Sequence, residues 1–280
     1  MQNYAAEVLA KIDERFYLDS KTQSVVNNGL TFEFSGVNTV TIYDIDVVPE
    51  NNYIRSGTMR YGQLVELGDG VQSFTLSQDK SFAISIDRGN REDSKMVSAI
   101  DDAVKRQVRE VSVPTTDIYT LAVAQGYANV NNQKNQTPTN LTASNTFQSV
   151  LDRRAALTEA KVPVDKGLTV FVTPRTEAFL WRDSEFKGAC DKTKEDRATG
   201  KIGEIMGMSI VVVPSSYLPA KTGFLMLSNK VLVRPVKFNS VRTGDGFSFG
   251  IDGWVAQGRR YYDVFIPKNK GVGIQWWVEV

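Results

Sequence analysis

A long stripe of apolar residues at helical spacing is the feature that most restricts the fold of this chain. Val97, Ile100, Val104 and Val108 share one helical face, and charged residues occupy the opposite face. If the helix continues through Leu121, it spans about 30 residues and is roughly 45 Å long, because each helical residue rises ~1.5 Å. The sequence therefore predicts one dominant helix in this part of the chain.

Two features define the beginning and the course of this helix. Asp93 or Ser94 can cap its N-terminus, because either side chain accepts a hydrogen bond from a free backbone N–H group. Pro114 lies inside the apolar pattern, where a proline removes one backbone hydrogen bond and crowds the preceding turn. We therefore expect one long kinked helix or two helices end to end.

The N-terminal residues predict an arm followed by a strand. Apolar residues at helical spacing within residues 4–16 indicate a short amphipathic helix, an arm that packs on another surface. Residues 37–48 alternate roughly between apolar and polar, as in a half-buried strand. Asp44 and Asp46 share one side of this strand and could hold a divalent cation or act as an acid/base pair, although a solvated strand face is the commoner outcome.

Residues 49–93 have the composition of a projecting segment. Several glycines punctuate them, and apolar residues are mixed with charged ones. Residues 74–76 and 82–86 alternate between apolar and polar positions on either side of residues 77–80, which predicts a long two-stranded hairpin. We expect this hairpin to project from its domain, and an ordinary edge hairpin is the alternative.

The second half of the chain alternates loops, helices and strands. Residues 129–145 are rich in Asn, Gln and Thr, which favours a linker or exposed loop and a domain boundary. Residues 147–157 predict an amphipathic helix, and residues 168–172 predict a short apolar strand. Thr173 and Pro174 then supply an N-cap and a first helical residue. Most of the remaining sequence predicts strands and turns.

The composition excludes several functional classes. The chain has no histidine and its one cysteine is Cys190, so Ser-His-Asp sites, Cys-His sites and zinc sites with His or several Cys ligands cannot be built. We expect no catalytic site, no metal and no cofactor, although carboxylate chemistry needs only Asp and Glu. With 33 Lys and Arg against 32 Asp and Glu, the net charge of +1 argues against tight binding of nucleic acid.

The sequence carries no signal for secretion or for a membrane. A lone cysteine cannot form an internal disulfide, and no apolar stretch approaches the length of a membrane span. We therefore expect a protein that is made and kept in a cytoplasm.

Two aromatic pairs near the C-terminus admit two interpretations. They could form a stacking platform for nucleic acid or a protein interface. Packing into the core is the commoner outcome, because neighbouring residues of a strand point to opposite faces and at least one is usually buried. The residues are Tyr261 with Tyr262 and Trp276 with Trp277, beside Arg259 and Arg260.

A local pattern in the second half resembles the axial domain of a known family. The stretch Gly167-Leu-Thr-Val-Phe-Val-Thr-Pro174 leads through residues 179–183 to residues 200–213 and then to residues 216–219. With the order of the other parts, it resembles the major capsid proteins of tailed bacteriophages, which have the Hong Kong 97 capsid fold. The resemblance covers nearly the whole chain. It implies an α+β fold with an N-terminal arm, an extended β-hairpin loop, a long spine helix, a peripheral domain and an axial domain.

The resemblance also implies a division of the chain and a function. The expected parts are an arm (1–48), an extended loop (49–93), a peripheral domain with the spine helix (94–128 and 224–280) and an axial domain (129–223). The implied function is mechanical: hexamers and pentamers of identical subunits form the icosahedral shell of a virion, assembled in the host cytoplasm. Candidate contact residues between subunits are Ile12, Phe16, Ile54, Arg55, Met59, Arg60, Tyr61 and Leu64.

Partners and alternatives follow from the same resemblance. A separate scaffolding protein and a portal are expected partners, and decoration proteins are a further candidate. Double-stranded DNA is expected inside the shell without specific binding. An encapsulin-type nanocompartment shell would have the same fold. A carboxylate-based hydrolase or a β-rich carbohydrate-binding module is the alternative from a different class.

Overall fold

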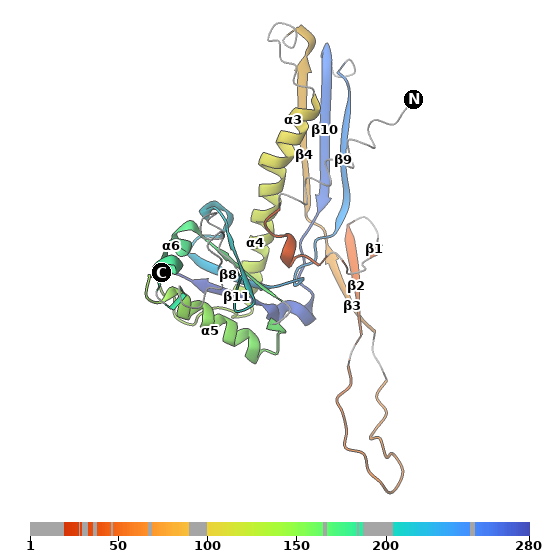
Figure 1. The fold of residues 1–280 in the computed structure, drawn as a ribbon. Helices are drawn as coiled ribbons and strands as arrows, with labels where there is room; N and C mark the ends of the chain where they lie inside the picture. The colour runs from red at the N-terminus through yellow and green to blue at the C-terminus, as the bar shows by residue number, and fades with distance from the viewer. Residues whose placement is uncertain are drawn as a thin grey trace.

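A helical run from Ile100 to Val130 forms the axis of the molecule (Figure 1). It consists of α3 (Ile100–Gln107), a π-helical segment η2 (Val108–Ser112) and α4 (Val113–Val130). Pro114 is the second residue of α4, and the wider π turn lies directly before it. Because a proline cannot donate a hydrogen bond and crowds the turn before it, a change of helical winding at this point accommodates it. The predicted long helix is confirmed, with a π turn at the proline.

The computed structural model describes residues 20–27, 29, 33–35, 38–45, 47–66, 69–89, 100–164, 167–183, 185–186, 204–246 and 250–280. Several predictions fall outside these ranges: the arm helix of residues 4–16 with Ile12 and Phe16, the N-cap at Asp93 or Ser94, and Cys190.

A three-stranded antiparallel sheet lies beside α3 and η2 (Figure 1). Its strands, in spatial order, are β4 (Gln78–Asp87), β10 (Gly253–Tyr262) and β9 (Val236–Asp245). Val241 and Ala256 of the sheet pack against Val104, Val108 and Val113 of the helical run. This small core attaches the sheet to the first half of the axis.

A five-stranded sheet forms the centre of a lobe beside α4 (Figure 1). Its strands, in spatial order, are β11 (Ile274–Val278), β8 (Thr222–Ser228), β5 (Leu168–Val172), β7 (Met208–Val212) and β6 (Glu204–Ile205). Two helices, α5 (Thr146–Glu159) and α6 (Pro174–Arg182), belong to the same lobe. The side-chain hydroxyl of Thr173 accepts a hydrogen bond from the backbone N–H of Thr176, which confirms the predicted cap of α6.

The two faces of this sheet are both buried, which explains its apolar strands. On β5, Phe171 packs into the cluster that contains Leu121 and Ala124 of α4. The neighbouring Val170 faces the other way, into the cluster that contains Val150 of α5. Alternate residues therefore supply two cores, as expected for a strand covered by helices on both sides.

The third sheet carries the longest extension of the molecule (Figure 1). Its strands are β1 (Glu33–Ser35), β2 (Thr39–Ile45) and β3 (Asp69–Thr75), and all neighbours pair antiparallel. Val40 and Ile42 of β2 are buried, so the predicted half-buried strand is confirmed. Val47, which we expected to belong to the same strand, lies beyond its end and is exposed.

The predicted hairpin of residues 74–86 is wrong. β3 pairs with β2, where Phe74 faces Val40, whereas β4 pairs with β10, where Ile84 faces Ala256. The alternation of apolar residues correctly indicated two strands and their faces, but it carries no information about their partners. The chain crosses from one sheet to the next at residues 76–77.

The Asn-rich segment is a loop, as predicted, but its interior is well anchored to the lobe. Asn135 is buried, its side-chain amide donates to the backbone oxygen of Val278 (3.0 Å), and its side-chain oxygen accepts from the Val278 N–H (2.6 Å). Leu141 is fully buried beside Trp277 in the lobe core. The polar composition predicted an exposed loop. Side-chain amides, however, can form the backbone hydrogen bonds that a neighbouring strand would otherwise form at the edge of a sheet.

The C-terminal aromatic pairs pack mainly into the core. Tyr262, Trp276 and Trp277 are buried, and Tyr261 is half-buried. The indole N–H of Trp276 donates to the hydroxyl of Thr222 at 3.1 Å. The core interpretation is therefore confirmed for these residues.

A buried carboxylate fixes the chain where the N-terminal segment meets α4. Asp117 accepts hydrogen bonds from the hydroxyl groups of Ser20 (2.6 Å) and Thr22 (2.7 Å) and from the backbone N–H of Lys21 (2.8 Å). Residues 25–27 then pair with Leu232 through backbone hydrogen bonds. The position of Ser20, the first residue that the structure describes, is thus set by α4.

Candidate assembly surfaces

An extended loop of residues 47–66 connects β2 and β3 and reaches far beyond the body of the molecule (Figure 1). Every residue of this loop is exposed except Gly62, which is half-buried. Leu64 is 97% exposed, Val47 is 92% exposed and Tyr61 is 83% exposed. Apolar side chains this exposed within one projecting segment are typical of a surface that binds another molecule.

The tip of the loop is ordered by contacts within the loop. The backbone N–H of Ile54 donates to the carbonyl oxygen of Arg60 at 2.9 Å, which closes residues 54–60 into a turn. The rings of Tyr53 and Tyr61 meet edge to face, with centroids 5.1 Å apart. The tip therefore presents its apolar residues in a defined arrangement even though it does not touch the body.

All the candidate contact residues that fall in described parts of the chain lie in this loop and are exposed. They are Ile54, Arg55, Met59, Arg60, Tyr61 and Leu64. Four further exposed apolar residues, Val47, Val48, Tyr53 and Val65, were not among the candidates. For Tyr53 and Val65 the signal was present in the sequence, because apolar residues within a segment rich in glycine and charge have few core partners. Whether these residues contact another subunit stays a prediction.

The base of the loop is attached firmly to the body. The rings of Phe74 and Phe265 stack with centroids 4.7 Å apart. The side-chain oxygen of Gln72 accepts from the backbone N–H of Lys268 at 3.0 Å. These contacts fix the base of the loop to the segment between β10 and β11.

A second buried carboxylate joins the loop base to the helical axis. Asp263 is buried and accepts hydrogen bonds from the N–H of Ser77 (2.7 Å), the hydroxyl of Tyr119 (2.6 Å) and the N–H of Val264 (2.7 Å). Burial raises the pKa of Tyr119, and the hydrogen bond to Asp263 raises it further. The phenol therefore stays protonated and remains a donor at neutral pH.

The outer face of the third sheet carries a smaller apolar patch. Tyr43 of β2 and Val71 of β3 lie directly opposite each other and both are exposed. The Tyr43 hydroxyl donates to the side chain of Glu33 at 3.2 Å, and this hydrogen bond is the main cause that raises the pKa of Tyr43. Exposed apolar residues therefore also occur on the sheet that carries the loop.

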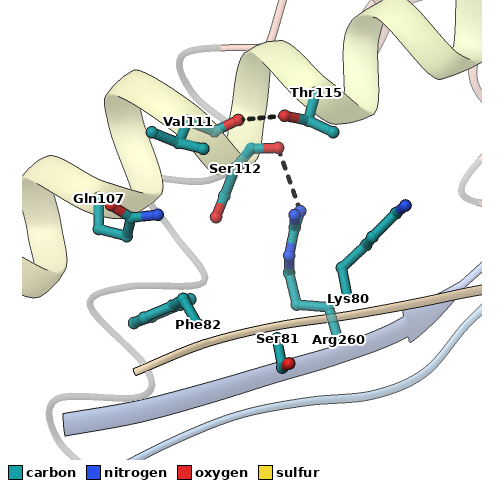
Figure 2. A pocket seen from close by; sticks show the side chains of 8 residues that line it. All are labelled: Lys80, Ser81, Phe82, Gln107, Val111, Ser112, Thr115 and Arg260. Carbon is teal, nitrogen blue, oxygen red and sulfur yellow. Dashed lines mark hydrogen bonds between the residues drawn. The ribbon is translucent and has the colours of Figure 1, made fainter. Parts of the chain in front are cut away.

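A cavity of about 140 Å³ lies between η2 and the strands β4 and β10. Figure 2 shows the side chains that line it. Arg260 extends from β10 toward the helix and donates to the backbone oxygen of Ser112 (3.1 Å) and the hydroxyl of Thr116 (2.9 Å). The hydroxyl of Thr115 donates to the backbone oxygen of Val111 at 2.6 Å. Arg260 and Thr115 thus supply hydrogen-bond donors to two carbonyl groups of the π turn. The polar side chains in this cavity therefore have a structural role in the helix.

The described residues contain no group of candidate metal ligands, and two cavities among them lack acidic lining residues. Neither this cavity nor the larger one between α5 and β11 has an acidic residue among its described lining residues. Across the described ranges, no three Asp, Glu or Cys side chains come together as metal ligands. No helix in the same ranges has the length and apolar character needed to cross a bilayer.

The spine-like helical run, the two attached sheets, the lobe and the extended loop together form a Hong Kong 97-type capsid fold. The mixed α+β class and the long helix were both predicted, and the structure confirms them.

Solved structures of viral shells have the same fold. A capsid structure of the cyanophage P-SCSP1u matches with a TM-score of 0.65 and 8% identity, over 88% of this chain and 85% of that chain. The mature capsid of bacteriophage PhiM1 matches with a TM-score of 0.60 and 11% identity, over 87% and 82%. A virus-like particle from Pyrococcus furiosus matches with a TM-score of 0.53 and 12% identity, over 99% and 100%. The resemblance to tailed-phage capsid proteins is thus confirmed at the level of the fold.

Comparisons of sequence add no further relatives. No protein-family model matches the chain, and no curated protein matches it.

The Asp263 junction predicts a large loss of stability when its carboxylate is removed. Asp263→Ala leaves three donors without their acceptor, and they belong to buried Val264, half-buried Tyr119 and exposed Ser77. The loss should lower the free energy of unfolding by about 3 kcal/mol. Tyr119→Phe removes one of these bonds and should cost about 1 kcal/mol. Urea unfolding of the dissociated chain measures both values. Equal effects of the two substitutions would contradict a junction centred on the carboxylate.

Proposed function

We propose that this chain is the major capsid protein of a tailed bacteriophage, and that many copies of it assemble into an icosahedral head around the genome. The observation that carries the proposal is the loop of residues 47–66, an extension of apolar residues with no partner surface on its own body. On a capsid-type fold, the surface that such a loop lacks is supplied by another copy of the chain.

The apolar side chains of the loop would supply the free energy of the proposed contact. Burial of one Leu-sized side chain contributes about 2 kcal/mol. A contact of this size is weak alone, but it repeats at every subunit of a closed shell, and each subunit is held by several neighbours. Exposed residues such as Leu64 and Tyr61 are therefore compatible with a soluble subunit and a stable particle.

The proposal includes the remaining parts of the chain and its partners. Residues 1–48 would serve as the arm, 49–93 as the extended loop, 94–128 and 224–280 as the peripheral domain, and 129–223 as the axial domain. Hexamers and pentamers would assemble in the host cytoplasm with scaffolding, portal and decoration proteins. The role is structural and not enzymatic, and a net charge of +1 suits a wall that encloses DNA without holding it tightly.

A second candidate is the shell of a protein-filled nanocompartment. The match to a virus-like particle from Pyrococcus furiosus, which spans 99% of this chain, favours this alternative. The contents of purified particles separate the two functions. Nuclease-protected double-stranded DNA in particles from the native host supports a phage head, whereas a protein cargo without DNA supports a compartment.

Assembly itself is the first prediction of the proposed function. The expressed chain should form closed shells or capsomer rings, alone or with a scaffolding partner, because its loop surface requires other copies. Light scattering and negative-stain microscopy measure particle size. A stable monomer of 31.1 kDa over a range of salt and protein concentrations, with a scaffolding partner present, would refute the proposal.

Leu64→Ser tests the contribution of the loop. The substitution removes a side chain whose burial would contribute about 2 kcal/mol. It should raise the protein concentration needed for assembly by at least about tenfold, while the subunit stays folded. Val130→Ser, at the end of α4, is the matched control because Val130 is also highly exposed but lies outside the loop. Sedimentation of particles against concentration gives the result, and equal effects of both substitutions would count against the loop contact.

Trypsin provides a test of the predicted contact residues Arg55 and Arg60. Both are exposed in the loop, so the dissociated chain should be cleaved after them readily. Assembly should slow these two cleavages at least tenfold, because the loop is then covered. Mass spectrometry of timed digests identifies each cut, and unchanged rates in assembled particles would show that the loop remains free.

A further inference from the structure

A cavity of about 350 Å³ lies at the edge of the lobe, between three segments of chain. One segment follows α5, one follows β8 and one precedes β11. Its volume lies in the range of small-molecule sites. The lining residues are Lys161, Val162, Pro163, Ser228, Asn229, Lys230, Val231, Asn269, Lys270, Val272 and Gly273.

Each of the three segments contributes one lysine to this cavity. They are Lys161, Lys230 and Lys270, and no acidic residue is present among the described lining residues. Val162 and Val231 are buried and form part of the apolar wall. Because an apolar wall lowers the local dielectric constant, it strengthens the attraction between these lysines and an anion.

Two of the lysines occupy backbone positions that favour glycine. Lys161 and Lys230 both have a φ of 60°, in the left-handed region. Lys161 is the residue after the C-cap of α5, where its N–H bonds to Thr158 O and the N–H of Val162 bonds to Leu157 O. Glycine is the usual residue in this motif. A lysine near a helix C-terminus also interacts favourably with the helix dipole, but this explains only Lys161.

The third lysine shows that the positive charges are crowded. The ammonium group of Lys270 is partly buried and donates to the backbone oxygen of Lys230 at 3.4 Å. Burial lowers the pKa of Lys270, and the charge of Lys230 lowers it further. A bound anion would favour the charged form of Lys270 and would therefore oppose both causes of the lowered pKa.

The type of cation indicates the type of anion. Arginine, whose planar group matches a carboxylate with two parallel hydrogen bonds, does not line this cavity among the described residues. Lysine acts as a point charge and is a common ligand of phosphate. Three lysines around one concave site suit a compact anion with several charges. We propose that this cavity binds the phosphoryl groups of a small polyphosphate through Lys161, Lys230 and Lys270.

The test is a calorimetric titration of the full chain with inorganic triphosphate at 150 mM salt and without divalent cations. We expect a dissociation constant of about 1 mM or tighter. The double variant Lys161→Gly, Lys230→Gly should bind at least tenfold more weakly, yet its thermal midpoint should be unchanged or higher, because glycine adopts the same backbone with less strain. This combination separates loss of the site from loss of the fold.

Lys221→Gly is the matched control. Lys221 has the same φ of 60° and the same charge, but it precedes β8 at the end remote from the cavity. It should leave triphosphate binding within twofold of the original. An equal loss in the control would show that only net charge attracts the anion, and this would overturn the proposal, as would the absence of heat from triphosphate.

A duplex DNA of about 20 base pairs distinguishes the source of the phosphoryl groups. A recessed site should prefer the small anion, so the duplex should not displace triphosphate. Binding of the duplex alone, with none of triphosphate, would also overturn the proposal. The result is independent of shell formation, because the titration is made on the chain in whichever oligomeric state it has.

Discussion

The buried carboxylate of Asp263 is the interaction on which the arrangement of the molecule depends. It joins the β3–β4 crossing at Ser77, the α4 helix at Tyr119 and the end of β10, which are the places where loop, axis and sheet meet. A buried charge is tolerated only when donors surround it, so these three elements must come together in one geometry. The projecting loop can then keep a fixed direction although its tip touches nothing else on the body.

Local sequence patterns were sufficient to predict those elements whose structure depends on neighbouring residues in the chain. The long helix, the cap of Thr173 and the strand of residues 168–172 all follow from periodicity or from capping chemistry. Strand partners were not predictable in this way. The crossing at Ser77 is fixed by Asp263, 186 residues further along the chain, so no pattern within residues 74–86 could show that its two strands belong to different sheets. The π turn before Pro114 also has a distant partner that no local pattern shows, since Arg260 donates to the carbonyl oxygen of Ser112.

The exposed surface was predictable in kind but not in extent. Apolar residues among glycines and charges predicted a loop without a core, and the six candidate residues in that loop are exposed. Val47 was assigned to the preceding strand because its alternation with Ile45 continues the strand pattern, yet pairing ends at Ile45. Only the register of β2 on β3 determines where the strand ends and the loop begins. The lysine cavity had no sequence signal, because its three segments are far apart in the chain.

The local order of the loop tip affects how strongly a few apolar contacts can bind. A flexible loop would lose conformational entropy at each residue on docking, and that loss could cancel the gain from burying Leu64 or Tyr61. The hydrogen bond from Ile54 to Arg60 and the contact of Tyr53 with Tyr61 already restrict the tip before it meets a partner. These two contacts lower the ordering cost that the proposed docking of the loop would carry, so more of the burial energy of its apolar side chains would go into assembly.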